Sequence, residues 1–292
     1  MREEVNIMFG VIGYGSINQI DNCLKSINRE KKIEDLVVII QNGILYKNSL
    51  QKKYPEIIII NGNKNIGPAK GRNILISYFL YKTDCSHLFF IDYDTTLISG
   101  CIDNLLIDLS TDIGIVGATL KYPDGTVLST GIDINKQYEP VYHRDILNVT
   151  QERDIVMTTA AIVSRQVFEK GVQFNPDYFA YWEDADFSIK IKDKGYKNIV
   201  CCDAIAIHPL KKKKFEKHIS YYMMRNRLFF LKNNYNLDDI NLAFIGLKDG
   251  LKILSIKNLL IRETFKKLFF SFLGLFDFLR RRMGKSSRMS NE

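Results

Sequence analysis

The first hundred residues alternate between short apolar runs and segments with helical spacing, and this alternation limits the possible fold more than any other feature. The apolar runs cover residues 5–12, 36–40, 57–60 and 87–92. Helical patterns between them begin near Ile17, near Tyr46 and at Pro68. This β-α-β-α order predicts an α/β fold with a mostly parallel, doubly wound sheet and right-handed crossovers.

The pattern is less regular after residue 94. We predict helices over residues 99–109, 183–195 and 215–234, and strands over 113–120, 155–164, 196–202 and 204–208. Residues 127–154 are polar and aperiodic, which predicts a long excursion over one face of the sheet. With 292 residues, 46% of them hydrophobic, the chain can bury one large core. We therefore predict one α/β domain over residues 1–235 and a basic, amphipathic helical extension over residues 236–292.

Charge and cysteine usage limit the possible binding partners and the cellular compartment. The net charge of +8 comes from local clusters, at residues 211–214 and in the C-terminal tail, which suits nucleic acid, anionic membrane or a phosphorylated substrate. Five cysteines without a Cys-x-x-Cys pair indicate a reducing compartment. No secretory leader is predicted, and the longest uncharged apolar run, residues 268–276, is shorter than a spanning helix. These features predict a cytoplasmic protein, soluble or peripheral on the inner face of the cell membrane.

Two acids, Asp92 and Asp94, end the apolar run at residues 87–92. Ligands bind at the carboxyl ends of parallel strands, so these acids are candidates for holding a cation. Asp-x-Asp alone is a weak signal, since it often marks a solvated turn. His208 also follows an apolar segment, and with Asp94 it could supply the protein side of a divalent-cation site. The alternative for His208 is a core histidine bonded to backbone.

Charged residues also open two predicted helices. Lys70 and Arg72 could contact phosphate, or could lie on a solvated helix surface. Asp184 could act as a general base, or could be an ordinary first-turn acid. Helical spacing predicts that Asp184 points inward and that Asp186 faces elsewhere.

The order of these residues resembles that of the family 2 inverting glycosyltransferases of the GT-A fold, which use nucleotide sugars to build bacterial surface polysaccharides. The ending at residues 272–285 is similar to that of the rhamnosyltransferase-like branch. The resemblance covers roughly residues 5–232 and rests on these motifs, in order: Tyr14, Gln41-Asn42-Gly43, Asn65-Ile66-Gly67, Gly71-Arg72-Asn73, Asp92-Tyr93-Asp94, Tyr181-Trp182-Glu183-Asp184, Ala206-Ile207-His208 and Arg225-Asn226-Arg227.

This resemblance implies a Rossmann-like GT-A sheet whose residues 1–98 bind the nucleotide and whose residues 99–235 bind the acceptor. It implies Mn²⁺ or Mg²⁺ on Asp94 with His208 nearby, and Asp92 on the ribose or sugar of a nucleotide-sugar donor, UDP or dTDP. The implied donor-binding residues are Tyr14, Gln41, Asn42, Asn65, Lys70, Arg72, Asp92, Tyr93 and Asp94.

On the acceptor side the resemblance implies Asp184 as the base that deprotonates the acceptor hydroxyl, with Glu183 as the alternative base. Trp182 and Arg225 are candidates for contact with the acceptor, a glycan or a polyprenyl-diphosphate-linked glycan. The products would be those of a single displacement that inverts the anomeric centre.

Two positions depart from the family pattern. Gln41 stands where the family usually has an Asp that reads the imide N–H of uracil or thymine, so an uncharged carbonyl would accept that bond. Thr158-Thr159-Ala160 replaces a common Thr-Gly-Ala stretch, which predicts a reshaped sugar pocket.

The tail and the rival functions leave alternatives open. Apolar residues recur near helical spacing from Leu259 to Leu279, with Lys and Arg between them. This pattern fits a helix in a membrane interface, or one packed on the rest of the chain or on a second subunit of a homodimer. Lys211 to Lys214 could be a solvated loop or could meet acceptor phosphates.

Two rival functions remain open. The first is a nucleotidyltransferase, which the absence of a basic residue beside Gly13-Tyr14-Gly15 opposes. The second is a basic membrane- or nucleic-acid-binding module, and for nucleic acid it is opposed by charge that is local and not spread along a recognition element.

Overall fold

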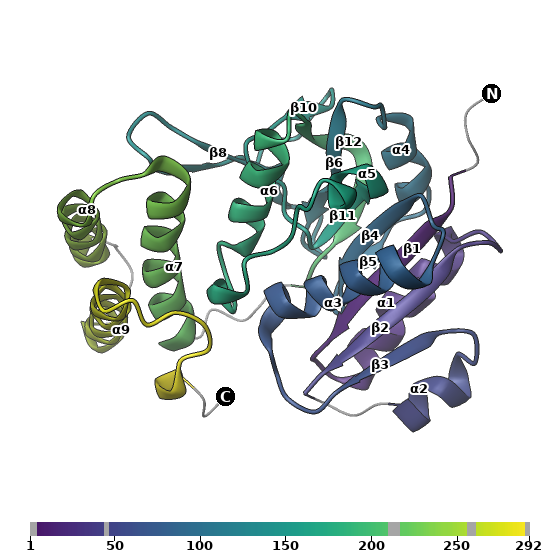
Figure 1. Cartoon of the computed structure of the whole chain (residues 1–292), viewed down its shortest axis with the longest axis horizontal. Helices are drawn as coiled ribbons and strands as arrows, with labels where there is room; N and C mark the ends of the chain where they lie inside the picture. The colour runs from purple at the N-terminus through teal and green to yellow at the C-terminus, as the bar shows by residue number, and fades with distance from the viewer. Residues whose placement is uncertain (1–4, 44–46, 210–216, 256–260, 290–292) are drawn as a thin grey trace. The chain divides into compact units, whose positions relative to one another are not determined.

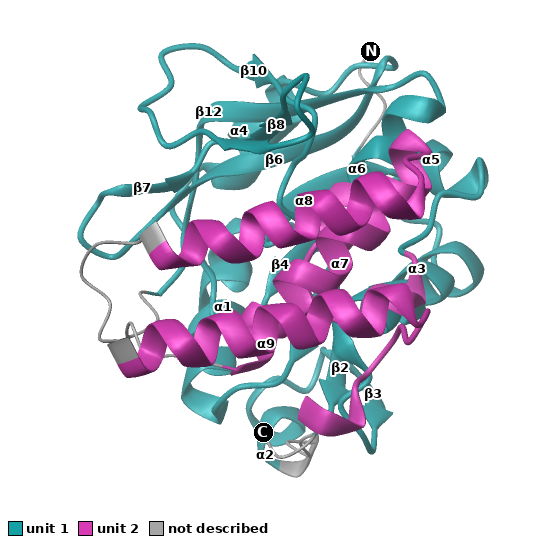
Figure 2. Ribbon diagram, turned by 90° about the vertical axis from the view of Figure 1, so that its left-hand side faces the viewer, with its two compact units in different colours: residues 1–174, 187–210 teal, residues 175–186, 211–292 magenta. Residues whose placement is uncertain are grey.

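The computed structural model describes residues 5–43, 47–209, 217–255 and 261–289 (Figure 1). The chain forms two compact units (Figure 2). Unit 1 contains residues 1–174 and 187–210, and unit 2 contains residues 175–186 and 211–292. The functional boundary that we expect at residue 235 stays a prediction. The basic run at residues 211–214 lies outside the described residues, as do residues 258–260 of the tail.

Unit 1 is built on a mixed sheet with the strand order β10-β12-β6-β11-β4-β1-β2-β3. Strands β3, β2, β1 and β4 are parallel, β12 is parallel to β6, and β11 runs antiparallel to both its neighbours. The strands are β1 (Ile7–Gly13), β2 (Leu36–Asn42), β3 (Ile58–Gly62), β4 (His87–Asp92), β5 (Thr96–Leu97), β6 (Ile113–Lys121), β7 (Val127–Ser129), β8 (Ile132–Ile134), β9 (Pro140–Tyr142), β10 (Gln151–Glu152), β11 (Ala160–Ser164) and β12 (Lys197–Ile207).

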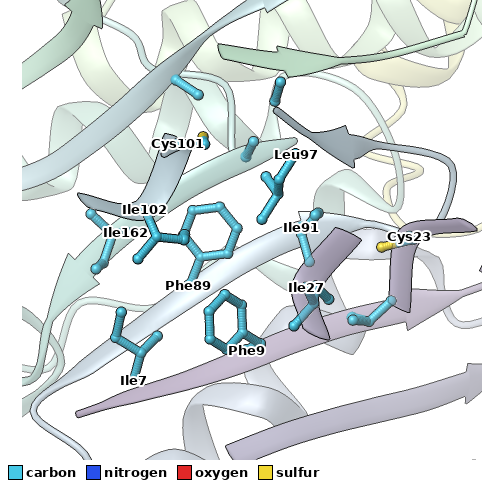
Figure 3. Packing of buried hydrophobic residues seen from close by; sticks show 14 of the residues in the cluster. Ile7, Phe9, Cys23, Ile27, Phe89, Ile91, Leu97, Cys101, Ile102 and Ile162 are labelled. Atoms are coloured by element: carbon cyan, nitrogen blue, oxygen red, sulfur yellow. The ribbon is translucent and has the colours of Figure 1, made fainter. Parts of the chain in front are cut away.

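The helices of unit 1 cover both faces of this sheet. On one face, Phe9 and Phe89 pack beneath α1 and α4 (Figure 3). On the other face, Leu88 and Phe90 pack against α3, α5 and the part of α6 that belongs to unit 1. Successive strand residues point to opposite faces, so runs buried on both faces are apolar throughout. The helices are α1 (Ile17–Glu30), α2 (Lys47–Lys53), α3 (Gly67–Lys82), α4 (Cys101–Ile107), α5 (Arg165–Glu169) and α6 (Glu183–Asp193).

The expected alternation of strands and helices is confirmed through residue 121, and two later strand predictions need correction. The strand expected at residues 155–164 begins at Ala160, because Ile155 bridges to Ile132 instead. The strands expected at 196–202 and 204–208 form one strand, β12, with a shift of register between Cys201 and Ile205. The polar excursion contains the short strands β7 to β10.

Unit 2 contains the helices α7 (Lys217–Tyr235), α8 (Asp239–Lys252) and α9 (Ile261–Leu279), with short 3₁₀ turns at Pro176–Tyr178, Ile253–Ser255 and Ser287–Met289. Glycines let these helices approach closely. A Cβ at Gly274 of α9 would lie 2.4 Å from the carbonyl oxygen of Tyr221 in α7, and one at Gly246 of α8 would lie 2.8 Å from the Leu275 side chain. No helix within the described ranges combines the length and apolarity needed to cross a membrane.

Candidate active site

The segment Asp92-Tyr93-Asp94 crosses the carboxyl edge of the sheet in unit 1. Asp92 is the last residue of β4, and its carbonyl accepts a hydrogen bond from Thr95 N at 3.0 Å. The chain then pairs as β5 with the end of β12, Thr96 opposite Ile207. Since β12 and β4 are separated by β6 and β11 in the sheet, β5 carries the acidic segment toward the strand that ends just before His208.

Asp92 is held on both carboxylate oxygens. Its Oδ1 is 3.0 Å from Nη2 of Arg72, and its Oδ2 accepts a hydrogen bond from the Thr159 hydroxyl at 3.1 Å. The Arg72 side chain is 4% exposed, and its guanidinium lies 5.5 Å from the centre of the Phe174 ring. Arg72 is therefore a buried cation aimed at the acidic edge, whereas Lys70, two residues earlier, is exposed. The sequence allows either phosphate contact or a solvated helix surface for both residues, whereas the structure buries Arg72 and exposes Lys70.

Asp94 and His208 face each other. Asp94 Oδ1 is 3.5 Å from Nε2 of His208, and the side chains are 6% and 17% exposed. The other ring nitrogen, Nδ1, lies 3.2 Å from the carbonyl oxygen of Pro209. A carbonyl can only accept, so this contact is a hydrogen bond when Nδ1 carries the proton. In the neutral ring the lone pair is then on Nε2, toward Asp94.

This donor set fits a divalent cation. Metal-bound histidines commonly donate their second ring N–H to a carbonyl, as His208 can to Pro209. Octahedral ligands about 2.1 Å from a metal lie about 3 Å apart, close to the separation of Asp94 Oδ1 and His208 Nε2. Among the described residues no group of three or more His, Cys, Asp or Glu could hold a metal. Asp94 and His208 would therefore need oxygens from substrate or water to complete the coordination.

Tyr93, between the two acids, packs against the turn after β1. A Cβ at Gly15 would lie 1.9 Å from Cε2 of Tyr93, so this position accommodates glycine and little else. Tyr14, next to Gly15, is 38% exposed. The turn between β1 and α1 is thus placed by Tyr93, which leaves the Tyr14 ring accessible for a ligand.

Asparagines tie the end of β2 to the loop between β3 and α3. Asn42 Oδ1 accepts from Ile66 N at 2.8 Å, and Asn42 Nδ2 donates to Asn65 Oδ1 at 3.3 Å. Asn65 Oδ1 also accepts from Gly67 N at 2.9 Å, which fixes the start of α3. Gln41 is fully buried and, by strand alternation, shares the α1 face with Ile39. The contacts of the two asparagines are structural, and donor binding by Gln41, Asn42 and Asn65 stays a prediction.

The expected base belongs to unit 2, at the start of α6. Glu183 is 5% exposed, whereas Asp184 is half-buried and so the more accessible of the two acids. The expectation that Asp186 faces away from the interior is wrong. Asp186 is 1% exposed, and its Oδ1 accepts from the Tyr178 hydroxyl and from Asn234 Nδ2, each at 3.2 Å. These partners lie before α6 and at the end of α7, where helical spacing within α6 gives no information.

The segment that leads into α6 has an unusual backbone. Phe179, Tyr181 and Trp182 have φ values of 61°, 66° and 70°. Left-handed conformations cost energy for residues with a Cβ, more so for aromatic ones, and persist where neighbouring contacts enforce them. Strain of this kind is concentrated at functional sites, which supports a functional role for the residues next to Asp184.

Side chains of α7 supply those enforcing contacts. Asn226 Nδ2 lies 2.8, 2.6 and 2.9 Å from the carbonyl oxygens of Tyr178, Ala180 and Tyr181. Arg225, fully buried, donates to Tyr178 O at 3.2 Å and to Gly284 O at 2.8 Å. Its described contacts are therefore structural, and an acceptor role for Arg225 or Trp182 stays a prediction. We call Arg225 and Asn226 the α7 clamp.

Sequence reasoning does not predict the contacts of two residues that shape these sites, Phe174 and Thr159. Phe174 lies beside Arg72, and its backbone exchanges two hydrogen bonds with the Asn73 side chain, at 2.8 and 2.9 Å. Thr159 contacts Asp92 because β11 is antiparallel and begins at the edge where β4 ends. The departure at Thr158-Thr159-Ala160 pointed to this position without revealing its partner.

Comparison with known proteins identifies the fold. No protein-family model matches the chain, and no curated protein matches it by sequence. A mannosyltransferase from Pyrobaculum calidifontis in complex with GDP-Man and Mn²⁺ aligns with a TM-score of 0.63 and 11% identity, over 94% of this chain and 87% of that one. S. aureus TarS 1-349 in complex with UDP-GlcNAc aligns with a TM-score of 0.56 and 14% identity, over 82% and 70%.

GalNAc-T7 with UDP, GalNAc and Mn²⁺ aligns with a TM-score of 0.59 and 10% identity, over 72% of this chain. The alignment spans 44% of GalNAc-T7, less than half of that longer protein. The chain therefore has the GT-A-like, Rossmann-like fold of these glycosyltransferases, and the predicted fold class is confirmed.

Proposed function

We propose that the protein is an inverting family 2 glycosyltransferase, which moves a sugar from a nucleoside diphosphate to a hydroxyl group of a glycan. The observation that carries the proposal is the meeting of Asp94 Oδ1 and His208 Nε2, 3.5 Å apart, at the sheet edge where Arg72 pairs with Asp92. Proteins of the same fold have been solved with UDP or GDP-Man together with Mn²⁺, which supports this reading of the edge.

On the donor side, Asp94 and His208 would hold Mn²⁺ or Mg²⁺. Such a cation neutralises the charge that develops on a departing nucleoside diphosphate. Arg72 would lie near the phosphates and Asp92 near the ribose or sugar. Tyr14 and Gln41 would frame the base, with Asn42, Asn65, Lys70 and Tyr93 completing the donor side.

On the acceptor side, Asp184 would accept the proton of the attacking hydroxyl. The acceptor oxygen forms a bond to the anomeric carbon while the bond from that carbon to the diphosphate oxygen breaks, and the nucleoside diphosphate leaves with the bonding electrons. One displacement of this kind inverts the anomeric centre. The partial exposure of Asp184, against the burial of Glu183, supports Asp184 as the base.

We propose a hexosyl or rhamnosyl residue as the transferred sugar and a polyprenyl-diphosphate-linked glycan as the acceptor, in cell-surface polysaccharide biosynthesis. That acceptor would bring the protein to the inner face of the cell membrane. UDP or dTDP is the expected nucleotide. Because Gln41 has no charge, we expect weaker discrimination between bases than an aspartate would give.

A thermal-shift series with UDP, dTDP, GDP and ADP, each with and without Mn²⁺, tests the proposal. A ligand that binds only the folded state at one hundred times its Kd adds about 2.7 kcal/mol of stability. We expect UDP or dTDP with Mn²⁺ to give the largest shift, and Asp94→Asn or His208→Ala to remove its Mn²⁺ dependence. Asp84→Asn, an exposed acid, is the control. If no nucleotide stabilises the protein in either condition, the proposed donor class is wrong.

A further inference from the structure

The helices α8 and α9 lie side by side in unit 2, with α7 behind both (Figure 2). Their inner faces are packed. A Cβ at Gly250 of α8 would lie 2.8 Å from the Phe272 ring of α9, and Leu275 and Phe278 of α9 are buried. The inner side of α9 thus packs on the rest of the chain, which is one of the alternatives given for the tail. The outer side is a separate feature.

The outer sides carry large apolar side chains in the open. Phe244 of α8 is 67% exposed, and Phe265 and Phe269 of α9 are 63% and 64% exposed. Exposed apolar residues recur every three or four positions along α8 and every four or seven positions along α9, so those of each helix lie on one side of it. We define the α8–α9 face by Ile240, Phe244, Leu247 and Leu251 of α8 and Phe265, Phe269 and Phe276 of α9.

Basic residues border this face on both helices. Lys248 and Lys252 of α8, Arg262 and Lys266 of α9, and Arg280 just after α9 are exposed. Three acids nearby are paired within unit 2. Asp239 pairs with Arg281 at 3.0 Å, Asp249 pairs with Arg227 and lies 3.9 Å from Nζ of Lys252, and Asp277 is buried against Arg288. Glu263 is half-buried. The face is therefore apolar at its centre and positive at its border.

We propose that the α8–α9 face binds an anionic lipid surface, with its phenylalanines in the headgroup and acyl boundary and its basic border on the lipid phosphates. Apolar stripes with Lys and Arg alongside have the composition of helices that lie in a membrane interface. A second copy of the chain fits less well. In a symmetric dimer the basic border of one copy would face the same basic border of the other, and the like charges would repel. The structure thus extends the predicted lipid contact from the tail to α8.

The test is co-sedimentation of the full chain with vesicles of phosphatidylcholine alone, or with 30% phosphatidylglycerol. We expect binding to the anionic vesicles that weakens with salt. Phe265→Ser/Phe269→Ser should lower the partition coefficient at least about tenfold. Lys248→Glu and Lys266→Glu should each lower it at least about fivefold. The control Tyr81→Ser removes an 80% exposed ring on α3 and should change nothing.

Unchanged vesicle binding by Phe265→Ser/Phe269→Ser would overturn the proposal. So would a dimer that these substitutions convert to monomer, since the face would then bind a second copy. Point variants are preferable to removing residues 258–292, because that deletion also takes away Asp277, which accepts a hydrogen bond from the buried Tyr221 at 2.8 Å. Lipid binding is measured without sugar transfer, and the nucleotide thermal shift of the same variants shows separately whether the donor site works.

Discussion

Nη2 of Arg72 lies 3.0 Å from Oδ1 of Asp92, in a pair whose cation is 4% exposed and whose acid is 28% exposed. The second oxygen of Asp92 accepts from Thr159, and the ring of Phe174 lies beside the guanidinium. Asp92 is consequently fixed in orientation, while Asp94, two residues later, faces His208. The two acids of the segment thus have different partners and, under the proposed function, different roles.

Replacing Arg72 should weaken donor binding. Arg72→Ala leaves Asp92 without its cation and opens space beside Phe174, so we expect at least tenfold weaker nucleotide binding and a loss of about 2 kcal/mol in the free energy of unfolding. Titration calorimetry with UDP and Mn²⁺, together with urea unfolding, measures both. Lys70→Ala, from the same turn of α3, should change stability by less than about 0.5 kcal/mol. Equal losses of stability in Arg72→Ala and Lys70→Ala would show that the buried pair of Arg72 and Asp92 does not stabilise the fold.

We expect Asp184 and Asp186, both in the first turn of α6, to have different roles: Asp184 acts in sugar transfer, and Asp186 stabilises the fold. Asp184→Asn should lower kcat by about 10²- to 10⁴-fold with the affinity for donor unchanged, because a general base contributes about that much. Asp186→Asn should instead lower stability, since Asp186 accepts from Tyr178 and Asn234 in the interior. Steady-state kinetics and urea unfolding on both variants separate these outcomes. Near-normal transfer by Asp184→Asn, with loss in Glu183→Gln, would move the base to Glu183.

The core of unit 1 could be predicted from the sequence because its strands are buried on both faces. Phe9 and Phe89 belong to one face and Leu88 and Phe90 to the other, so the runs are apolar throughout and easily recognised. Strands β7 to β10 are two or three residues long, too short to show a period. They depend on partners elsewhere, as β10 does on β12.

The sequence identifies candidate residues for the site but predicts few of their contacts. The ends of two apolar runs and the family resemblance both predict Asp94 and His208 at one cation site, and the pairing of β5 with β12 brings Oδ1 of Asp94 and Nε2 of His208 to 3.5 Å. The difference between Lys70 and Arg72 was not predictable, because it depends on Phe174, which is distant in sequence. For the same reason helical spacing wrongly predicts that Asp186 faces away from the interior, where its Oδ1 accepts hydrogen bonds from Tyr178 and Asn234. Long-range partners decide which polar residues are buried, and periodicity does not identify them.

Loss of the α7 clamp should disturb transfer without disturbing donor binding. Asn226→Ala removes the amide that donates to carbonyl oxygens in the segment from Tyr178 to Tyr181. Without it, the left-handed residues Phe179, Tyr181 and Trp182 can relax and shift the neighbouring Asp184. We expect kcat to fall at least tenfold, the donor Kd to stay within about twofold, and stability to fall by about 2 kcal/mol.

A matched substitution shows whether this effect is local. Asn148→Ala removes an exposed asparagine outside the segment and should leave kcat and stability unchanged. If Asn226→Ala lowered stability but left kcat per folded molecule intact, the clamp would serve folding alone. A parallel fall in donor affinity would instead indicate damage that reaches unit 1.

The last prediction concerns His87, at the start of β4. Burial lowers the pKa of His87 to about 4, from 6.5 for the ordinary imidazole. The unfolded chain therefore binds this proton below pH 6.5 while the folded chain resists it, so stability falls as the pH drops from 6.5 toward 4. Between pH 7 and pH 5 this group alone should cost about 2 kcal/mol. Urea unfolding of the unmodified protein and of His87→Asn at both pH values isolates the effect, because all other titrating groups are shared. The variant should lose about 2 kcal/mol less on acidification, and equal losses would mean that His87 does not resist protonation in the folded state.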